Sequence, residues 1–150
     1  MAAEELEKHL LVELMSGWAQ TAEKAGTLLL LEPLNRYETH LVKRLSDAVE
    51  QVQRVNRPDG LKIMADFFHM AIEERDIAAS IRNAGTWIAH VHLADSTREL
   101  PGYGHTDFES GFEALRETGF DGYMAMECGI PGDDKATELK KSADYLKSMM

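Results

Sequence analysis

The sequence is poor in cysteine, proline and basic residues. Cys128 is the only cysteine among 150 residues, so an intramolecular disulfide is excluded and a reducing, cytoplasmic location is expected. With only 4 prolines and no low-complexity tract, the chain does not have the composition of a disordered or fibrous protein. The 16 basic residues are outnumbered by 26 acidic ones, and the net charge of −10 opposes binding to nucleic acid or to a membrane surface.

Long hydrophobic runs are also missing. The longest, around Leu28–Leu31, is too short to span a bilayer, and the first ten residues, MAAEELEKHL, are charged, so no signal peptide is expected. Hydrophobic residues still make up 44% of the chain, which is enough to build one core. We therefore predict a single domain over residues 1–150.

Two kinds of apolar pattern alternate along the chain. Helical spacing predicts helices over residues 3–25, 41–55, 72–84, 108–118 and 134–149. Short apolar runs between them predict strands at residues 27–32, 61–66, 87–93 and 123–127. Strict alternation with short connections is typical of right-handed βαβ units, so we predict an α/β fold with four parallel strands and covering helices.

Two details of the helices can be predicted as well. In the first helix, a stripe with helical spacing is formed by Leu6, Leu10, Leu14, Trp18 and Ala22. The acidic pair Glu73-Glu74 is interpreted as the beginning of the third helix, where negative charge suits the helix dipole.

A carboxylate or an imidazole stands at the end of every predicted strand: Glu32, Asp66, His92 and Glu127. In parallel α/β folds, ligands bind at the carboxyl ends of the strands. One polar residue there can simply mark where a buried strand emerges into water, but four out of four favours a metal site. Three oxygen ligands and one imidazole suit Mn²⁺, Mg²⁺ or Co²⁺.

The segments that surround these positions resemble a known group of enzymes. LEPLNRYE, ADFFHMAIEE, HVHLADSTR, PGYGH and YMAMEC are similar to the xylose-isomerase-like sugar phosphate isomerase/epimerase superfamily, and most of all to ketose 3-epimerases of the D-tagatose/D-psicose type. The resemblance covers nearly the whole chain but corresponds to the last four βα units of the family's (β/α)8 TIM barrel. It implies that residues 1–150 form half a barrel.

The resemblance also implies roles for individual residues. By position, Glu32, Asp66, His92 and Glu127 match the metal ligands of the family, and Glu32 and Glu127 also match its acid–base pair. The implied reaction is proton transfer at a carbon next to a carbonyl, through an enediolate, on a ketose or sugar phosphate. One carboxylate removes the proton and the other returns it from the opposite face.

Three further positions match the substrate-binding part of the family's site. His69 and Arg98 match residues that bind substrate hydroxyls, and Glu38 matches a position that supports the first catalytic glutamate. In one respect the chain departs from many relatives: Phe67 and Phe68 follow Asp66, where a smaller polar residue is common. These two rings are expected to make the pocket smaller or drier.

Two other functions stay open. A non-catalytic half-barrel could associate with itself and keep only a metal or sugar site. An apurinic-site endonuclease is ranked last, because its basic DNA surface and the ligands from the first half of its barrel are absent. Either way, the edges of the first and last strands would be unpaired, so we predict a homodimer in which a second copy completes the barrel.

Overall fold

The computed structural model describes residues 3–150 and contains one sheet with its helices. The sheet has four parallel strands in sequence order, β1 (Leu29–Leu31), β2 (Leu61–Asp66), β3 (Ile88–Leu93) and β4 (Tyr123–Met126). The helices are α1 (Ala3–Ala25), α2 (Leu45–Val55), α3 (Phe67–Glu73), α4 (Ile77–Ala84), α5 (Phe108–Glu117) and α6 (Lys135–Lys147), with a short 3₁₀ turn, η1, at Gly85–Trp87. The prediction of four parallel strands with covering helices is confirmed.

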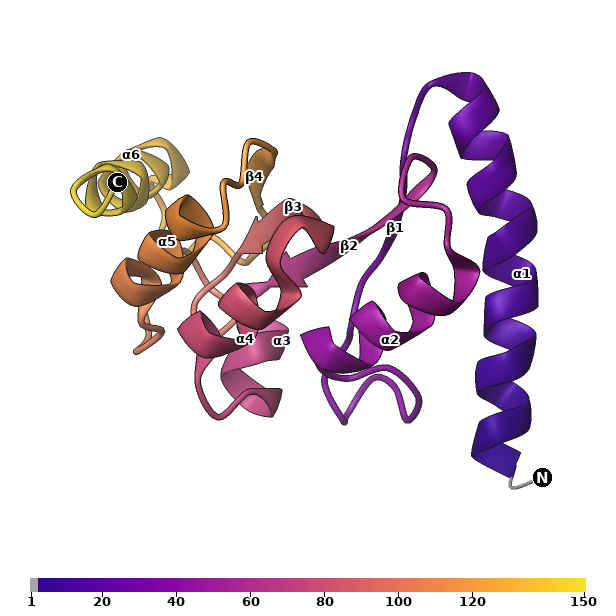
Figure 1. The fold of residues 1–150 in the computed structure, drawn as a ribbon. Coiled ribbons are helices and arrows are strands. Elements are labelled where there is room, and N and C mark those ends of the chain that lie inside the picture. The colour runs from indigo at the N-terminus through magenta and orange to yellow at the C-terminus, as the bar shows by residue number, and fades with distance from the viewer. Residues whose placement is uncertain (1–2) are drawn as a thin grey trace.

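The helices form a row along one side of the sheet. Neighbours in this row, α1 with α2, α2 with α4 and α4 with α5, contact one another, and Figure 1 shows α1 and α6 at its opposite ends. The core lies between the helices and the sheet. Its largest aromatic group stacks Phe67 on Phe108, with ring centroids 5.3 Å apart, and Phe112 packs beside both.

The prediction of one helix over residues 72–84 is wrong, because α3 ends at Glu73 and a new helix, α4, begins at Ile77. Glu74 is in an extended conformation, and Asp76 begins α4 by accepting a hydrogen bond from the backbone N–H of Ala79. The acidic pair therefore ends one helix instead of starting another. The Glu74 carboxylate accepts the backbone N–H of Leu45, the first residue of α2, and so stabilises the start of a different helix.

The register of the strands decides which residues lie opposite one another near the carboxyl ends of β2, β3 and β4. Asp66 lies opposite His92, and His92 lies opposite Ala125, two residues before Glu127. Between β2 and β3 the pairing shifts by one residue, so that Ala89 is extra, as in a β-bulge. Without this shift Val91 would lie opposite Asp66, and the imidazole of His92 would point to the other face of the sheet.

The apolar stripe predicted on α1 lies mostly on its outer side. Leu6, Leu10, Leu14 and Trp18 are 48–54% exposed, whereas the buried side of α1 is formed by Met15 and Ala19. These four side chains form a hydrophobic row on the outer side of α1. Among residues 3–150, no helix combines the length and the apolar character needed to cross a bilayer.

Candidate metal and substrate site

The four predicted ligands meet at the carboxyl ends of the strands. One donor atom from each of Glu32, Asp66, His92 and Glu127 lies within 4.8 Å of the other three. His92 Nδ1 is 3.2 Å from Glu127 Oε2, 3.6 Å from Asp66 Oδ2 and 3.7 Å from Glu32 Oε1. Ligands of one cation at about 2.0–2.6 Å lie about 3 Å apart when adjacent and about 4–5 Å apart when opposite, so these spacings fit a single ion.

Asp66 is held in place by the helix that follows it. Its Oδ1 accepts hydrogen bonds from the backbone N–H groups of Phe68, at 2.7 Å, and His69, at 3.3 Å, and so caps the N-terminus of α3. The other oxygen, Oδ2, faces His92. In Asp66, Oδ1 therefore stabilises the start of α3, and Oδ2 is available to bind a cation.

The cluster concentrates negative charge in a partly buried place. Burial, and next the charge of Asp66, raise the pKa of Glu32 to about 7, and burial raises the pKa of Asp66 as well. Glu32 Oε1 and His92 Nδ1 are buried and have no hydrogen-bond partner among the described residues. A divalent cation would satisfy both atoms and offset the repulsion, so the residues present fit a metal.

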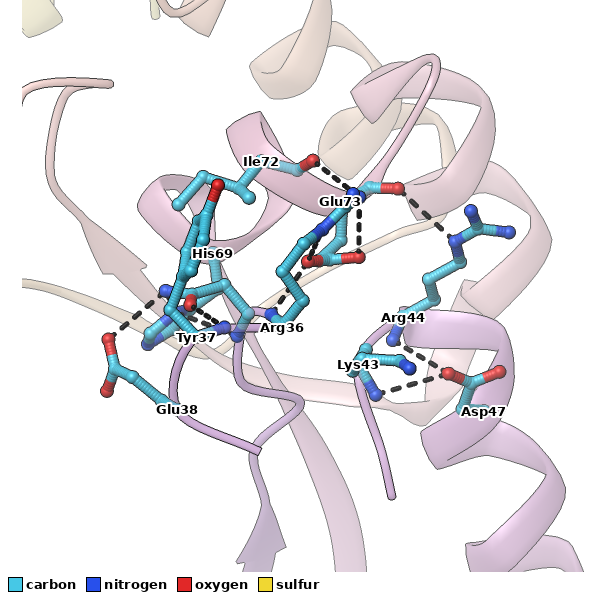
Figure 2. A network of polar contacts seen from close by, with 10 residues as sticks. Arg36, Tyr37, Glu38, Lys43, Arg44, Asp47, His69, Ile72 and Glu73 are labelled. Carbon is cyan, nitrogen blue, oxygen red and sulfur yellow. Dashed lines mark hydrogen bonds and ion pairs between the residues drawn. The ribbon is translucent and has the colours of Figure 1, made fainter. Parts of the chain in front are cut away.

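The predicted substrate-binding residues are joined to the cluster by one polar chain. Arg98 Nη1 donates to Glu38 Oε1 at 2.7 Å, and Asn35 Nδ2 donates to the same oxygen at 3.1 Å. Asn35 also contacts His69, whose Nε2 is 3.9 Å from Glu32 Oε1. The structure thus brings together all three predicted residues, and the positions of Glu38 and His69 can be followed in Figure 2.

Arg98 is held in an unusual conformation. Its φ of 59° is in the left-handed region, which a residue with a side chain seldom adopts, and such strain concentrates at functional sites. Its backbone is fixed on both sides, because its N–H donates to Asp95 and its carbonyl accepts from Gly129. The guanidinium lies 4.7 Å from the ring centre of Phe68, so this aromatic residue supports Arg98 by a cation–π contact.

Two contacts of the loop after β1 could not be predicted from the sequence. Glu73, at the end of α3, is only 3% exposed and accepts hydrogen bonds from the backbone and the guanidinium of Arg36, as Figure 2 shows. Asn35 is buried and connects Glu38 with His69. Contacts between residues more than thirty positions apart leave no local pattern in a sequence. The only sequence signal for Asn35 and Glu73 was that they lie near residues that were already candidates.

Comparison with known proteins gives the family. Residues 3–149 match the family described as "Xylose isomerase-like TIM barrel". The chain belongs to this family. This xylose isomerase-like chain is 37% identical over 129 residues to 3-dehydro-D-guloside 4-epimerase of Escherichia coli K12, covering 86% of the chain and 49% of that protein. It is also 37% identical over 116 residues to D-psicose 3-epimerase of Ruminiclostridium cellulolyticum, covering 77% and 39%.

Solved structures give the same result. The apo form of 3-keto-D-glucoside 4-epimerase from E. coli superposes with a TM-score of 0.91 at 32% identity, covering 97% of this chain and 55% of that one. D-psicose 3-epimerase with D-tagatose, from Clostridium cellulolyticum H10, gives 0.92 at 28% identity, covering 99% and 58%. The chain thus spans about half the length of the relatives it matches, and the prediction that it forms half of a TIM barrel is confirmed.

Proposed function

We propose that this chain carries the metal-binding and acid–base residues of a sugar epimerase or isomerase. The observation that carries the proposal is the cluster of Glu32, Asp66, His92 and Glu127, in which two buried atoms have no hydrogen-bond partner within residues 3–150. These four residues would hold a divalent cation, Mn²⁺, Mg²⁺ or Co²⁺. When bound, the cation supplies the positive charge that acidifies a carbon-bound proton next to a carbonyl and stabilises an enediolate.

The other steps, proton transfer and substrate binding, are carried out by side chains of the site. Glu32 takes the proton from the carbon, and Glu127 gives one back from the other face. In the metal-free protein, burial, and next the charge of Asp66, raise the pKa of Glu32 to about 7; a bound cation would lower this pKa and keep the carboxylate ionised, as a base must be. His69 and Arg98 hold oxygens of the ketose or sugar phosphate, while Glu38 orients Arg98 through their 2.7 Å ion pair.

The experiment is to follow the carbon-bound proton directly. The Mn²⁺-loaded protein is incubated in D₂O with D-fructose, D-tagatose or a ketohexose phosphate, and deuterium uptake next to the carbonyl is measured by mass spectrometry. Uptake is expected, and Glu32→Gln or Glu127→Gln should reduce it at least about a hundredfold. Glu109→Gln, an exposed change on α5, is the matched control and should have no effect.

Two outcomes would contradict the proposal. Undiminished uptake in metal-saturated Glu32→Gln protein would remove Glu32 from the mechanism. Metal or sugar binding without any uptake would instead favour the second candidate, a non-catalytic half-barrel. That candidate has some support, because Glu127 directly follows the last strand, β4, and its side chain is 56% exposed.

We infer in addition that two copies associate to complete the barrel. The supporting observation is that both ends of the half-barrel expose large hydrophobic side chains. Trp18 on α1 is 54% exposed at one end, and Tyr123 on β4 is 83% exposed at the other. Pairing of β1 from one copy with β4 of the second would cover both edges.

A further inference from the structure

Asn35 is a buried polar side chain between the two parts of the site. It is 1% exposed, and its neighbours are His69, which lies beside the metal cluster, and Glu38, which holds Arg98. We propose that Asn35 is a positioning residue that fixes His69 in the tautomer with its proton on Nε2, so that His69 donates a hydrogen bond to a substrate oxygen. The inference rests on the proposed function, because it assumes that a sugar binds beside Glu32.

The orientation of the Asn35 amide is decided by the backbone. The N–H of Tyr37 donates to Asn35 Oδ1 at 2.9 Å. A backbone N–H can only donate, so the atom that faces it must be the amide oxygen; turning the amide over would set two donors against each other. The Nδ2 group of Asn35 is therefore on the side of His69 and Glu38.

Two donors then converge on one ring nitrogen of His69. Asn35 Nδ2 is 2.9 Å from His69 Nδ1, and the backbone N–H of Asn35 donates to the same nitrogen at 3.2 Å. A nitrogen that accepts hydrogen bonds cannot carry a proton, so Nδ1 is bare and the proton of the neutral ring is on Nε2. The other amide hydrogen is used by Glu38 Oε1, 3.1 Å from Nδ2, so the amide has little freedom to rotate.

The resulting donor points at the metal cluster. His69 is 2% exposed, and its Nε2 lies 3.9 Å from Glu32 Oε1, which is too long for a direct hydrogen bond. Its proton is thus directed to an oxygen atom bound beside Glu32. A carbonyl or hydroxyl oxygen of a ketose can accept this bond, and the bond becomes stronger as negative charge develops on that oxygen in an enediolate.

Nitrogen-15 NMR of the histidine rings tests the tautomer without any substrate. Protonated and bare ring nitrogens have well-separated nitrogen-15 shifts, and the signals of His69 are assigned by their loss in His69→Gln. At roughly pH 8, above the usual histidine pKa, the wild-type ring should show a bare Nδ1 and a protonated Nε2. In Asn35→Asp a carboxylate oxygen replaces the Nδ2 donor while the backbone N–H of residue 35 still faces Nδ1, so the fraction of rings with the proton on Nδ1 should rise above that of the wild type.

The matched control is Asn83→Asp, which makes the same change of charge on the exposed surface of α4 and should leave the His69 shifts as in the wild type. A wild-type His69 with its proton on Nδ1, or an even mixture of tautomers, would overturn the inference, even if Asn35→Asp failed to fold. Unchanged shifts in a folded Asn35→Asp protein would overturn it as well. The predicted tautomer in a protein that takes up no deuterium from D₂O would instead count against the proposed function.

Discussion

At the scale of single residues, Glu32 has the strongest reason to bind a cation. It is partly buried beside Asp66, and the two carboxylates oppose each other's ionisation. Its raised pKa of about 7 means that, in the metal-free protein, a proton occupies Glu32 at slightly acidic pH. Proton and cation therefore compete for the same side chain.

The first prediction is a loss of metal affinity as the pH falls. The folded pKa is raised above the usual value for glutamate, so the proton stabilises the metal-free protein below about 7, and this contribution is lost as the pH rises through 7. The metal affinity is expected to change in the opposite direction. It should be full above pH 7 and fall about tenfold per pH unit below it, and titration calorimetry at several pH values measures this change. The Glu32→Gln protein should bind more weakly but with a flatter pH dependence; equal slopes in both proteins would contradict the account.

The convergence of Glu32, Asp66, His92 and Glu127 could be predicted from the sequence because each stands at the end of an apolar strand, and parallel strands end at one edge of a sheet. Asn35 could not be predicted in this way. A buried asparagine in a loop has no periodic pattern, and its partner His69 lies on a different element. The role of Glu73 was missed for a similar reason, since its contact with Arg36 joins a helix end to a distant loop.

At the scale of elements, the bulge in β3 determines which face His92 is on. Ala89 is the extra residue, and Gly122, just before β4, lies against it. A side chain at Gly122 would overlap the carbonyl oxygen of Ala89 and would also contact the ring of Phe120, at 2.8 Å. Gly122 therefore leaves the room that the bulge needs.

The second prediction follows from this contact. Gly122→Ala should lower the free energy of unfolding by about 1–3 kcal/mol, because the overlap forces backbone shifts, and it should also weaken metal binding by moving His92. Urea denaturation and calorimetry measure the two effects. Gly17→Ala, on α1 with nothing within 4 Å of the added group, is the control and should stabilise the protein by about 0.5–1 kcal/mol. Normal metal affinity in folded Gly122→Ala protein would contradict the role of the bulge.

The positions of strands and helices were largely predictable, because periodicity separates a helix from a buried strand. β2 has the predicted bounds, Leu61–Asp66, and α1 has the predicted range, Ala3–Ala25. Two features could not be predicted from periodicity: the break between α3 and α4, and the bulge at Ala89. Both depend on tertiary contacts. Glu74, for example, leaves the helical pattern to bind the start of α2.

At the scale of the whole molecule, the half-barrel has two exposed apolar ends. In a closed dimer, two sets of three carboxylates would face one mouth, and bound cations would relieve their repulsion. The third prediction is therefore a homodimer that becomes more stable when Mn²⁺ is added, measured by light scattering or sedimentation. Trp18→Glu should weaken association at least about tenfold, because it places a charge in the apolar stripe of α1.

Gln20→Glu adds the same charge at another exposed position of α1 and should leave the dimer intact. A monomer at micromolar concentration that does not respond to metal would exclude this assembly. So would a dimer that is equally stable with either substitution.

The central claim is that the four strand ends bind one cation, and Asp66→Ala tests it most directly. This change removes a ligand and also the cap of α3, so the control must remove a cap alone. Asp76→Ala does so, because Asp76 caps α4 through Ala79 and is outside the cluster. Titration calorimetry with Mn²⁺ should give one site per chain in the wild type and in Asp76→Ala, and at least about tenfold weaker binding in Asp66→Ala. Equal affinity in all three proteins would contradict the assignment of the site.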